Sequence, residues 1–418
     1  MKKLSIYIPT YNRKEYLKRQ LEFIFSDMGE YSSEIEVVVS DNASDDGTKE
    51  VVEDLLQKYK FAYYRNEVNV GIRANAQMAE RYCKGEFQWT IGDDDYIKPG
   101  TTKKIFQILN VYPDINFIFL NFADMFGKTL GDGVSDSVMP EEFCKGYVEN
   151  AASFLMEHFD AMWNPLLFVS AHIFRREIWN RAIKLIPPDT LEGYGIDLIT
   201  AMVAIKLGKS YFEPEICAYC NYRNCSWYAE AFQSFCGIHM SLKKLIKMEG
   251  GYSQFEIQQM YRALFEMSLY NVQPFRDKDI AENEIRHFET FLFKSAGYPM
   301  SEYMDRKETI SFPYQLDKYK NKRVVIYGAG KVGRALHREC LDYGICVVAW
   351  CDRNYQEIQE EGLNVSSPEI IANLEYDYIF DAVFSWEDID EIFSLLKNLG
   401  ADVNQIRKLF PEFRLIIA

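Results

Sequence analysis

The sequence predicts an α/β fold in which two α/β regions are joined by a helical connector. Short apolar runs alternate with amphipathic helical patterns over the first 125 residues. Polar and acidic residues follow the ends of several of these runs. A glycine-rich turn follows a further apolar run near residue 328. Alternating strands and helices predict a mostly parallel sheet that is covered by helices on both faces.

The elements of the first region follow from their periodicity. Strands are expected at residues 4–8, 35–39, 61–64, 86–91 and 116–122, and helices at 48–59, 72–83 and 100–111. The helix expected between the first two strands carries one apolar stripe, formed by Leu17, Leu21, Ile24 and Met28. Because ligands bind at the carboxyl ends of parallel strands, we expect the polar residues after these strands to lie close together.

The middle of the chain is less regular. A mobile loop is expected at 126–140, and further elements are expected as a helix at 141–157, a strand at 166–174, a helix at 196–208 and a strand at 210–219. From about residue 229 to 300 the apolar pattern is helical, which predicts a connector whose apolar residues pack in a core.

A new α/β region begins near residue 318. The strand-like run "RVVIY" leads into Gly328, Gly330 and Gly333, spaced as Gly-x-Gly-x-x-Gly, and Asp352 follows a second strand-like run. This pattern is typical of a dinucleotide-binding, Rossmann-like fold. The remaining length has room for one mononucleotide-binding half. The predicted domains are therefore 1–228, 229–317 and 318–418.

Composition and charge narrow the classes of function. A net charge of −15 argues against a broad nucleic-acid-binding surface. No apolar stretch approaches the roughly 20 residues of a membrane-spanning helix, and the start "MKKLSIYIPTYNR" does not read as an export signal. With nine cysteines, these features predict reduced thiols and a cytoplasmic location. The spacing of Cys217, Cys220, Cys225 and Cys236 favours incidental thiols over a zinc or iron–sulfur site.

Three consecutive carboxylates, Asp93, Asp94 and Asp95, follow the strand-like run that ends near residue 91. Aspartate is common in turns, so a solvated loop tip is one interpretation. The alternative is a hard cation, since Mg²⁺ or Mn²⁺ takes carboxylate and phosphate oxygens as ligands. A strand-end position favours the cation.

Four blocks of the sequence resemble glycosyltransferase family 2, the inverting transferases with the GT-A fold. They are "IPTYNR" (8–13), "SDNASDDGT" (40–48), "NVGIRANAQMAERYCKGEFQW" (69–89) and "GDDD" (92–95). The resemblance covers roughly the N-terminal half. It implies a GT-A fold and transfer of a sugar from a nucleotide-diphosphate sugar, with a UDP-sugar favoured. The acceptor implied is a hydroxyl of a surface glycan or of a lipid-linked precursor.

The same resemblance implies roles for the residues at the strand ends. Asp95 is the expected ligand of Mg²⁺ or Mn²⁺, while Asp93 and Asp94 are expected to hold ribose hydroxyls and the sugar. A divalent cation acts as a Lewis acid on the departing diphosphate. Asp41 is the expected base-reading carboxylate, because an ionised carboxylate accepts the N3–H of uracil or thymine.

Further members of the expected nucleotide pocket are Thr10, Tyr11 and Asn12, with Tyr11 offering a stacking face. Arg73 lies where the family often places a cation near the nucleotide, although a surface arginine explains it equally well. Asp45 and Asp46 are instead expected to cap the helix that begins near Thr48.

Inversion needs a general base on the face opposite the leaving group. Asp197, at the start of the helix over 196–208, is the expected base, with Glu192 as the alternative and helix capping as a compatible role. Relatives often carry a histidine after this helix, where the present sequence has Asn224. His172 is expected in the core or in an acceptor loop.

Two other functions stay open at this point. An NAD-linked oxidoreductase or nucleotide-sugar modifier would use the Gly328 turn, but the region is short and has no paired Tyr and Lys signature. A non-catalytic binder of nucleotide sugars would not need both the acidic triplet and Asp197. The expected partners are a nucleotide-sugar donor and a glycan or lipid-linked acceptor, with no nucleic acid. Peripheral association with a membrane is left open.

Overall fold

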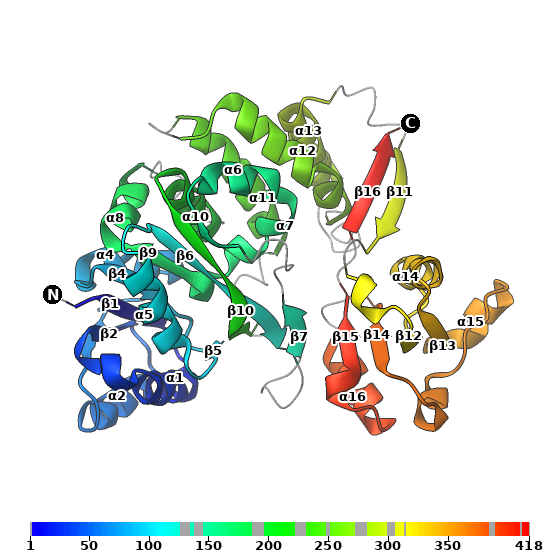
Figure 1. Cartoon of the computed structure of the whole chain (residues 1–418), viewed down its shortest axis with the longest axis horizontal. Coiled ribbons are helices and arrows are strands. Elements are labelled where there is room, and N and C mark those ends of the chain that lie inside the picture. The colour runs from blue at the N-terminus through cyan, green and yellow to red at the C-terminus, as the bar shows by residue number, and fades with distance from the viewer. Residues whose placement is uncertain are drawn as a thin grey trace. The chain divides into compact units, whose positions relative to one another are not determined.

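The computed structural model describes residues 2–125, 134–137, 145–185, 196–221, 231–247, 251–271, 282–298, 306–312, 315–383, 389–409 and 412–417. The chain forms two compact units (Figure 1). The N-terminal unit comprises Met1–Ala123 with Ser137–Ala263, and the C-terminal unit comprises Asp124–Asp136 with Leu264–Ala418. The predicted division at residues 228 and 317 is finer than this partition and stays a prediction. Most of the loop expected at 126–140 lies outside the described residues.

A mixed sheet forms the centre of the N-terminal unit, with the strand order β3-β2-β1-β4-β9-β6-β10-β5. The strands are β1 (Leu4–Thr10), β2 (Ile35–Asp41), β3 (Ala62–Arg65), β4 (Phe87–Thr90), β5 (Tyr96–Ile97), β6 (Phe117–Met125), β7 (Val134–Ser137), β8 (Gly146–Val148), β9 (His172–Arg175) and β10 (Ser210–Cys220). The four strands β3, β2, β1 and β4 are parallel, as predicted. Strand β9 is antiparallel to both β4 and β6, an arrangement that no local pattern predicts.

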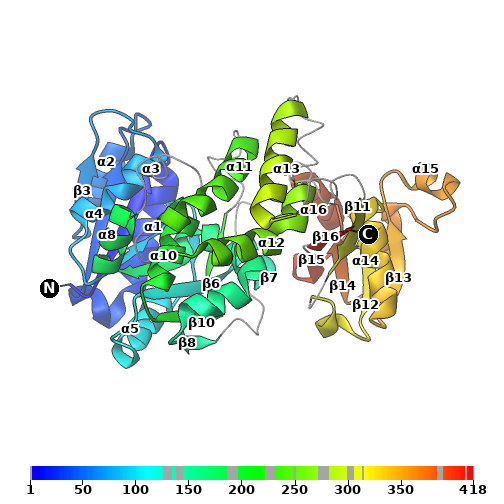
Figure 2. The same cartoon turned by 90° about the horizontal axis from the view of Figure 1, so that it is seen from above.

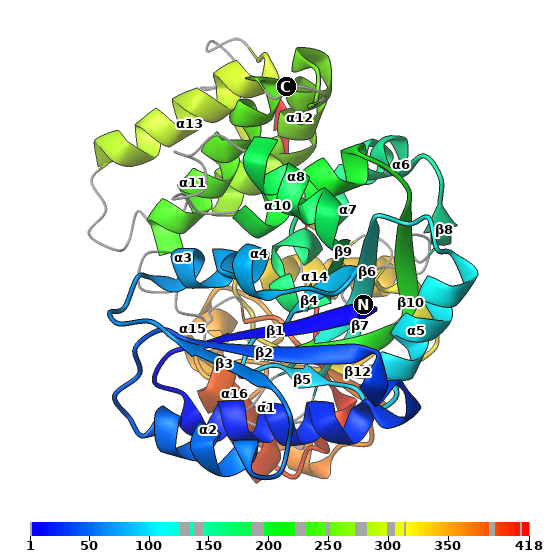
Figure 3. The same cartoon turned by 90° about the vertical axis from the view of Figure 1, so that its left-hand side faces the viewer.

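Helices cover both faces of this sheet (Figure 3). They are α1 (Lys14–Asp27), α2 (Thr48–Leu56), α3 (Ile72–Gln77), α4 (Ala79–Tyr82), α5 (Thr101–Val111), α6 (Ala151–Glu157), α7 (Phe159–Met162), α8 (Arg176–Leu185), α10 (Ile196–Lys206), α11 (Ala231–Leu242) and α12 (Gln254–Asn271), whose end lies in the C-terminal unit. Helices α1, α2 and α5 group on one face, and α6, α8 and α10 on the other. The predicted stripe of Leu17, Leu21, Ile24 and Met28 is buried. Helix α10 is the most enclosed, with every residue from Leu198 to Ile205 buried.

The carboxyl ends of the parallel strands meet at one edge of the sheet. Thr10 at the end of β1 pairs in register with Asp41 at the end of β2. Tyr7 of β1 pairs with Thr90 of β4, so the residues that follow β4 emerge beside Thr10. The predicted gathering of polar strand-end residues is confirmed.

The C-terminal unit contains a four-stranded parallel sheet of order β13-β12-β14-β15 (Figure 2). Its strands are β12 (Arg323–Tyr327), β13 (Cys346–Cys351), β14 (Tyr378–Asp381) and β15 (Ile406–Lys408), and its helices are α14 (Lys331–Asp342), α15 (Tyr355–Glu360) and α16 (Ile389–Asn398). Helix α13 (Glu282–Ala296) and an antiparallel pair, β11 (Arg306–Ser311) with β16 (Glu412–Ile417), complete the unit.

This strand order corrects part of the Rossmann-like prediction. After β13 the chain crosses to the other side of β12, which gives a 2-1-3-4 order instead of the 3-2-1 order of a dinucleotide-binding half. A parallel α/β domain is present as predicted. The direction of a crossover depends on how helices pack over the sheet, which the glycine motif does not encode.

The glycines of the turn after β12 have local structural reasons. Gly328 has φ +107°, and a Cβ on Gly333 would lie 2.0 Å from the Gly328 carbonyl oxygen. The Ala329 amide donates to Asp352 Oδ2 at 2.7 Å, and the Asn354 amide donates to Asp352 Oδ1 at 2.9 Å. The motif is thus explained by close packing of strand, turn and helix.

No helix within the described ranges combines the length and the apolar character that crossing a bilayer requires.

Candidate active site

The first two carboxylates of the triplet are buried, and the guanidinium group of Arg13 contacts both of them. Thr10 Oγ1 donates to Asp93 Oδ2 at 2.7 Å. Arg13 Nη1 lies 3.1 Å from Asp93 Oδ1 and 2.9 Å from Asp94 Oδ2. The structure therefore brings Thr10, Asp93 and Asp94 together as predicted, and adds Arg13 as a bridge between the two aspartates.

Asp95 is held by residues that lie far from it in the sequence. Ser170 Oγ donates to Asp95 Oδ2 at 2.6 Å, and the Asn221 amide donates to Asp95 Oδ1 at 3.2 Å. Neither Ser170 nor Asn221 was singled out from the sequence. Ser170 lies two residues before His172, and it carries no motif that could have revealed its role.

The triplet places three buried carboxyl groups side by side, where burial disfavours their charged forms. Burial raises the pKa of Asp93 to about 6, although the Arg13 guanidinium acts in the opposite direction. Burial, followed by the neighbouring Asp94 charge, raises the pKa of Asp95 to about 7, and the hydrogen bond from Ser170 opposes this rise. The Arg19 guanidinium donates to the main-chain oxygens of Asp94 and Asp95 at 2.9 and 3.3 Å. An excess of buried carboxylate oxygen fits a hard divalent cation.

Within the described part of the chain, no three His, Cys, Asp or Glu side chains come together as a complete metal site. Mg²⁺ is commonly held by one or two carboxylates together with phosphates. The donor set of Asp95 and its neighbours fits that mode of binding.

Asp41 lies at the end of β2 with its side chain fully buried. The Ser44 amide donates to Oδ1 at 2.8 Å, and the Tyr63 hydroxyl donates to Oδ2 at 2.6 Å. Arg65 Nε lies 3.2 Å from the same Oδ2. Both oxygens thus have protein partners, and Tyr63 and Arg65 of the edge strand β3 join the predicted base pocket.

The loop after β1 is locked against the loop after β2. Asn12 has φ +53°, its amide donates to Ser44 Oγ at 2.9 Å, and its Oδ1 accepts the Asp45 amide at 2.8 Å. Tyr11, by contrast, is 43% exposed, which leaves its ring available for contact with a ligand. Asn12 thus contacts the loop that follows Asp41, while the role of Tyr11 in the base pocket stays a prediction.

A network of asparagine side chains continues from this loop toward α3. Asn42 Oδ1 accepts the Val70 amide at 2.9 Å, and Asn42 Nδ2 donates to Asn69 Oδ1 at 2.7 Å. Asn66 Nδ2 donates to both Asn42 Oδ1 and Asn75 Oδ1 at 3.0 Å. These bonds fix the segment that carries the start of α3 against the carboxyl edge of the sheet.

Arg73, in the first turn of α3, is close enough to Asp197 for its charge to act on it. Burial raises the pKa of Asp197 to about 6, and the positive charge of Arg73 works against this increase. The structure thus associates two predicted site residues that are far apart in the sequence. Glu192, the alternative base, and Asn224 both lie outside the described residues.

Asp46 has a structural task that agrees with the predicted capping. Its Oδ1 accepts the Thr48 amide at 3.0 Å at the start of α2, and its Oδ2 accepts the Lys14 amide at 3.1 Å at the start of α1. Burial acts to raise the pKa of Asp46, but these hydrogen bonds outweigh it and hold the pKa below its usual value. One carboxylate therefore joins the N-termini of two helices.

His172 lies in the core. Its ring contacts Phe117, Phe119 and Phe174, and burial lowers its pKa to about 3. The core alternative for this histidine is therefore the one that the structure supports. Cys217 and Cys220 are buried, Cys236 is half-buried, and Cys225 lies outside the described ranges.

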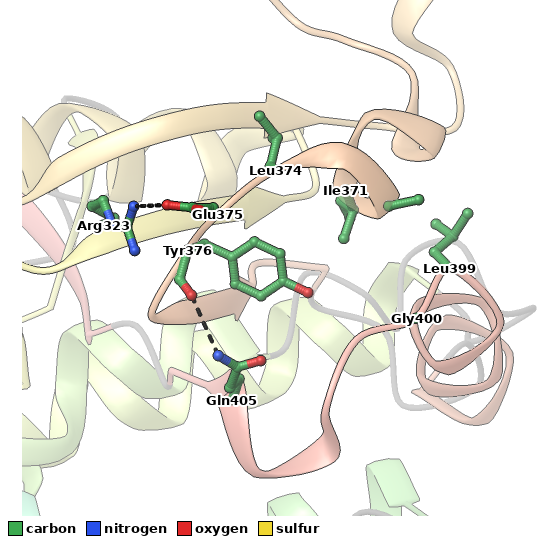
Figure 4. A pocket seen from close by; sticks show the side chains of 9 residues that line it. Arg323, Ile371, Leu374, Glu375, Tyr376, Leu399, Gly400 and Gln405 are labelled. Atoms are coloured by element: carbon green, nitrogen blue, oxygen red, sulfur yellow. Dashed lines mark hydrogen bonds and ion pairs between the residues drawn. The ribbon is translucent and has the colours of Figure 1, made fainter.

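The C-terminal unit has a separate cavity of about 360 Å³ (Figure 4). Arg323 forms an ion pair with Glu375 at 3.0 Å on one side, and Gln405 donates to the Tyr376 carbonyl at 3.3 Å on another. Arg323 begins β12, so the cavity lies at the amino ends of the strands. Ligands of parallel sheets bind at the opposite ends, so this cavity does not correspond to the Gly328 turn.

Two family models match the chain, one mostly in the N-terminal unit and one in the C-terminal unit. Residues 5–177 match the family model described as Glycosyl transferase family 2. Residues 320–407 match a model described as C2185-like, N-terminal. The second match does not confirm the predicted NAD(P)-binding character of the C-terminal region.

Two of the curated relatives each match less than a third of the chain. Abequosyltransferase RfbV of Salmonella typhimurium is 38% identical over 113 residues, which are 27% of this chain and 32% of that protein. GalNAc(5)-diNAcBac-PP-undecaprenol beta-1,3-glucosyltransferase of Campylobacter jejuni is 30% identical over 132 residues, 31% of this chain and 39% of that protein. The chain thus spans 32% and 39% of the lengths of these two relatives.

Among solved structures, residues 1–349 of S. aureus TarS in complex with UDP-GlcNAc superpose with a TM-score of 0.53. The superposition covers 86% of this chain and 92% of that chain at 16% identity, a level at which the likeness shows the fold alone. Together with the family match, it confirms a GT-A-like architecture. The chain thus matches glycosyltransferase family 2 over residues 5–177, and it continues into a small C-terminal parallel α/β domain.

Proposed function

We propose that the protein is an inverting glycosyltransferase that moves a sugar from a nucleotide-diphosphate sugar to an acceptor hydroxyl. The observation that carries the proposal is the buried triplet Asp93–Asp95, which gathers three carboxyl groups at the carboxyl edge of the sheet. Its position in a glycosyltransferase family 2 domain supports the same conclusion.

The donor in this proposal is a UDP-sugar. Asp41 would lie at the uracil edge, Tyr11 would stack on the base, and Thr10 and Asn12 would complete the pocket. The crystallisation of TarS, a protein of similar fold, with UDP-GlcNAc is consistent with this assignment. Asp93 and Asp94 are assigned to the ribose and sugar hydroxyls, with Arg13 holding both carboxylates in place.

Asp95 is the residue assigned to Mg²⁺ or Mn²⁺. When bound, the cation supplies Lewis-acid stabilisation of the negative charge on the departing diphosphate. The task of the chain itself is to hold the carboxylate in one orientation. Ser170 and the Asn221 amide provide that restraint.

Asp197 is assigned as the general base. A carboxylate whose pKa is raised to about 6 accepts a proton more readily than one with the ordinary value of 3.8. It is also still ionised at neutral pH, and the charge of Arg73 helps to maintain that state. In this role Asp197 removes the acceptor proton on the face of the sugar opposite the leaving group.

The acceptor is proposed to be a hydroxyl of a surface glycan or of its lipid-linked precursor, reached in the cytoplasm or at the membrane surface. The names of the curated relatives, an abequosyltransferase and an undecaprenol-linked glucosyltransferase, support this class.

The experiment that tests the proposal measures UDP binding by calorimetry with and without Mn²⁺, alongside NAD binding. We expect UDP to bind, Mn²⁺ to tighten that binding, and NAD not to bind. A screen of nucleotide sugars for donor hydrolysis then identifies the sugar. Stoichiometric NAD binding without UDP binding would overturn the proposal in favour of an oxidoreductase.

A further inference from the structure

Ser170 is a fully buried serine whose hydroxyl joins two parts of the acidic turn. It lies in a short 3₁₀ helix (Val169–Ala171) that precedes β9. Its Oγ accepts the Gly92 amide at 2.8 Å and donates to Asp95 Oδ2 at 2.6 Å. Because the amide can only donate, the single hydroxyl proton of Ser170 is directed at Asp95.

The position of Ser170 is itself fixed. Its carbonyl oxygen accepts the Trp89 indole N–H at 2.8 Å, and the Trp89 side chain is buried in β4. The strand that delivers the acidic turn therefore also anchors the serine that contacts it. This arrangement leaves the Ser170 hydroxyl little freedom to turn away from Asp95.

The carboxylate of Asp95 has two unequal oxygens. Oδ2 receives the short bond from Ser170 and lies over Gly92, where a Cβ would come within 2.6 Å of it. Oδ1 receives a longer bond, 3.2 Å, from the Asn221 amide. Oδ2 is thus enclosed by Ser170 and the chain at Gly92, whereas Oδ1 is the less strongly engaged oxygen.

We propose that Ser170 is a positioning residue that fixes the Asp95 carboxylate so that Oδ1 is the oxygen offered to the divalent cation. This inference rests on the proposed function, in which Asp95 binds the cation. Hydrogen bonds to ligating groups orient them and account for roughly 10- to 100-fold in metal affinity. Without the hydroxyl, the carboxylate can rotate and the cation loses its preformed ligand.

The test compares Ser170→Ala with a matched control, Ser210→Ala. Ser210 is also fully buried in the N-terminal unit, at the start of β10, but its Oγ has no hydrogen-bond partner among the described residues. Mn²⁺ affinity is measured by electron paramagnetic resonance in the presence of saturating UDP, and UDP affinity is measured in EDTA. Ser170→Ala is expected to weaken Mn²⁺ binding by about 10- to 100-fold and to leave metal-free UDP binding unchanged. Ser210→Ala is expected to change neither.

Ser170→Cys keeps the size of the side chain but donates weakly, so it serves if the alanine variant does not fold. We expect it to weaken Mn²⁺ binding in the same direction. Unchanged Mn²⁺ affinity in a folded Ser170 variant overturns the positioning role while leaving the proposed function intact. If the unaltered protein binds UDP but no Mn²⁺, the metal assignment fails first, and this inference fails with it.

Discussion

Arg13 Nη1 lies 2.9 Å from Asp94 Oδ2, so a guanidinium directly faces the middle carboxylate of the acidic triplet. The same nitrogen also contacts Asp93. The charge of Arg13 lowers the pKa of Asp93, which burial would otherwise raise further. Arg13 belongs to the "IPTYNR" block, yet no pattern in the sequence links it to the aspartates. The proposed donor site thus contains a resident positive charge next to its carboxylates.

Arg13→Gln is expected to weaken UDP binding by about tenfold or more, the scale of one hydrogen bond to a charged group. Without Arg13 the pKa of Asp93 rises above about 6, so the loss should be larger near pH 6 than at pH 8. Calorimetric titration of UDP at several pH values measures this. Lys49→Gln, which removes a charge from an exposed ion pair with Glu53, is the control and should bind normally. Equal affinity in both variants would contradict the role of Arg13.

Asp95→Ala is expected to abolish transfer and the stimulation of UDP binding by Mn²⁺. Asp46→Ala is the contrasting variant, because its carboxylate binds the amides of Thr48 and Lys14. It should retain transfer but lose about 1 kcal/mol of stability, as expected for removal of a helix-capping group. Thermal denaturation and a donor-hydrolysis assay separate the two effects. Full activity in the Asp95 variant would refute the metal assignment.

The surroundings of Asp95 show which parts of the site the sequence predicts and which it does not. Apolar runs ending in polar residues predicted the shared edge, because a parallel sheet places all its carboxyl ends on one side. Ser170 and Asn221 could not be found this way, since they lie 75 and 126 residues from Asp95 and reach it only through folding. Ser170 comes close to Asp95 because strand β9, which follows it, pairs with β4, a strand far from it in the sequence.

Asp197→Asn is expected to lower turnover by about 100-fold or more while donor affinity is retained. The substitution preserves the shape of the side chain and removes its ability to accept the acceptor proton. Steady-state kinetics and UDP titration make the comparison. A parallel loss of donor affinity would instead identify Asp197 as a donor-binding or structural residue.

The pH dependence of transfer should report Asp197 and its neighbour Arg73. A base with a pKa of about 6 is protonated and inactive below that pH and ionised above it, so turnover should rise through about pH 6. Arg73 lowers this pKa, so Arg73→Gln should move the acidic limb to higher pH. The measurement is the pH profile of kcat for both proteins. If Arg73→Gln leaves the acidic limb of the kcat profile unchanged, a group other than Asp197 sets that limb.

The C-terminal α/β domain is expected to be dispensable for the chemical step, and two glycines allow a test in the full chain. A Cβ on Gly333 would lie 2.0 Å from the Gly328 oxygen, so Gly333→Ala should destabilise this domain. Gly330 has φ −69° and no atom within 4 Å of an added Cβ, so Gly330→Ala should leave its stability unchanged. Donor hydrolysis should persist in both variants, because the acidic triplet and Asp197 belong to the N-terminal unit.

Loss of hydrolysis in Gly333→Ala alone would show that the domain supports the chemistry. Loss in Gly330→Ala, with unchanged thermal stability, would instead indicate a ligand at the Gly328 turn that catalysis requires.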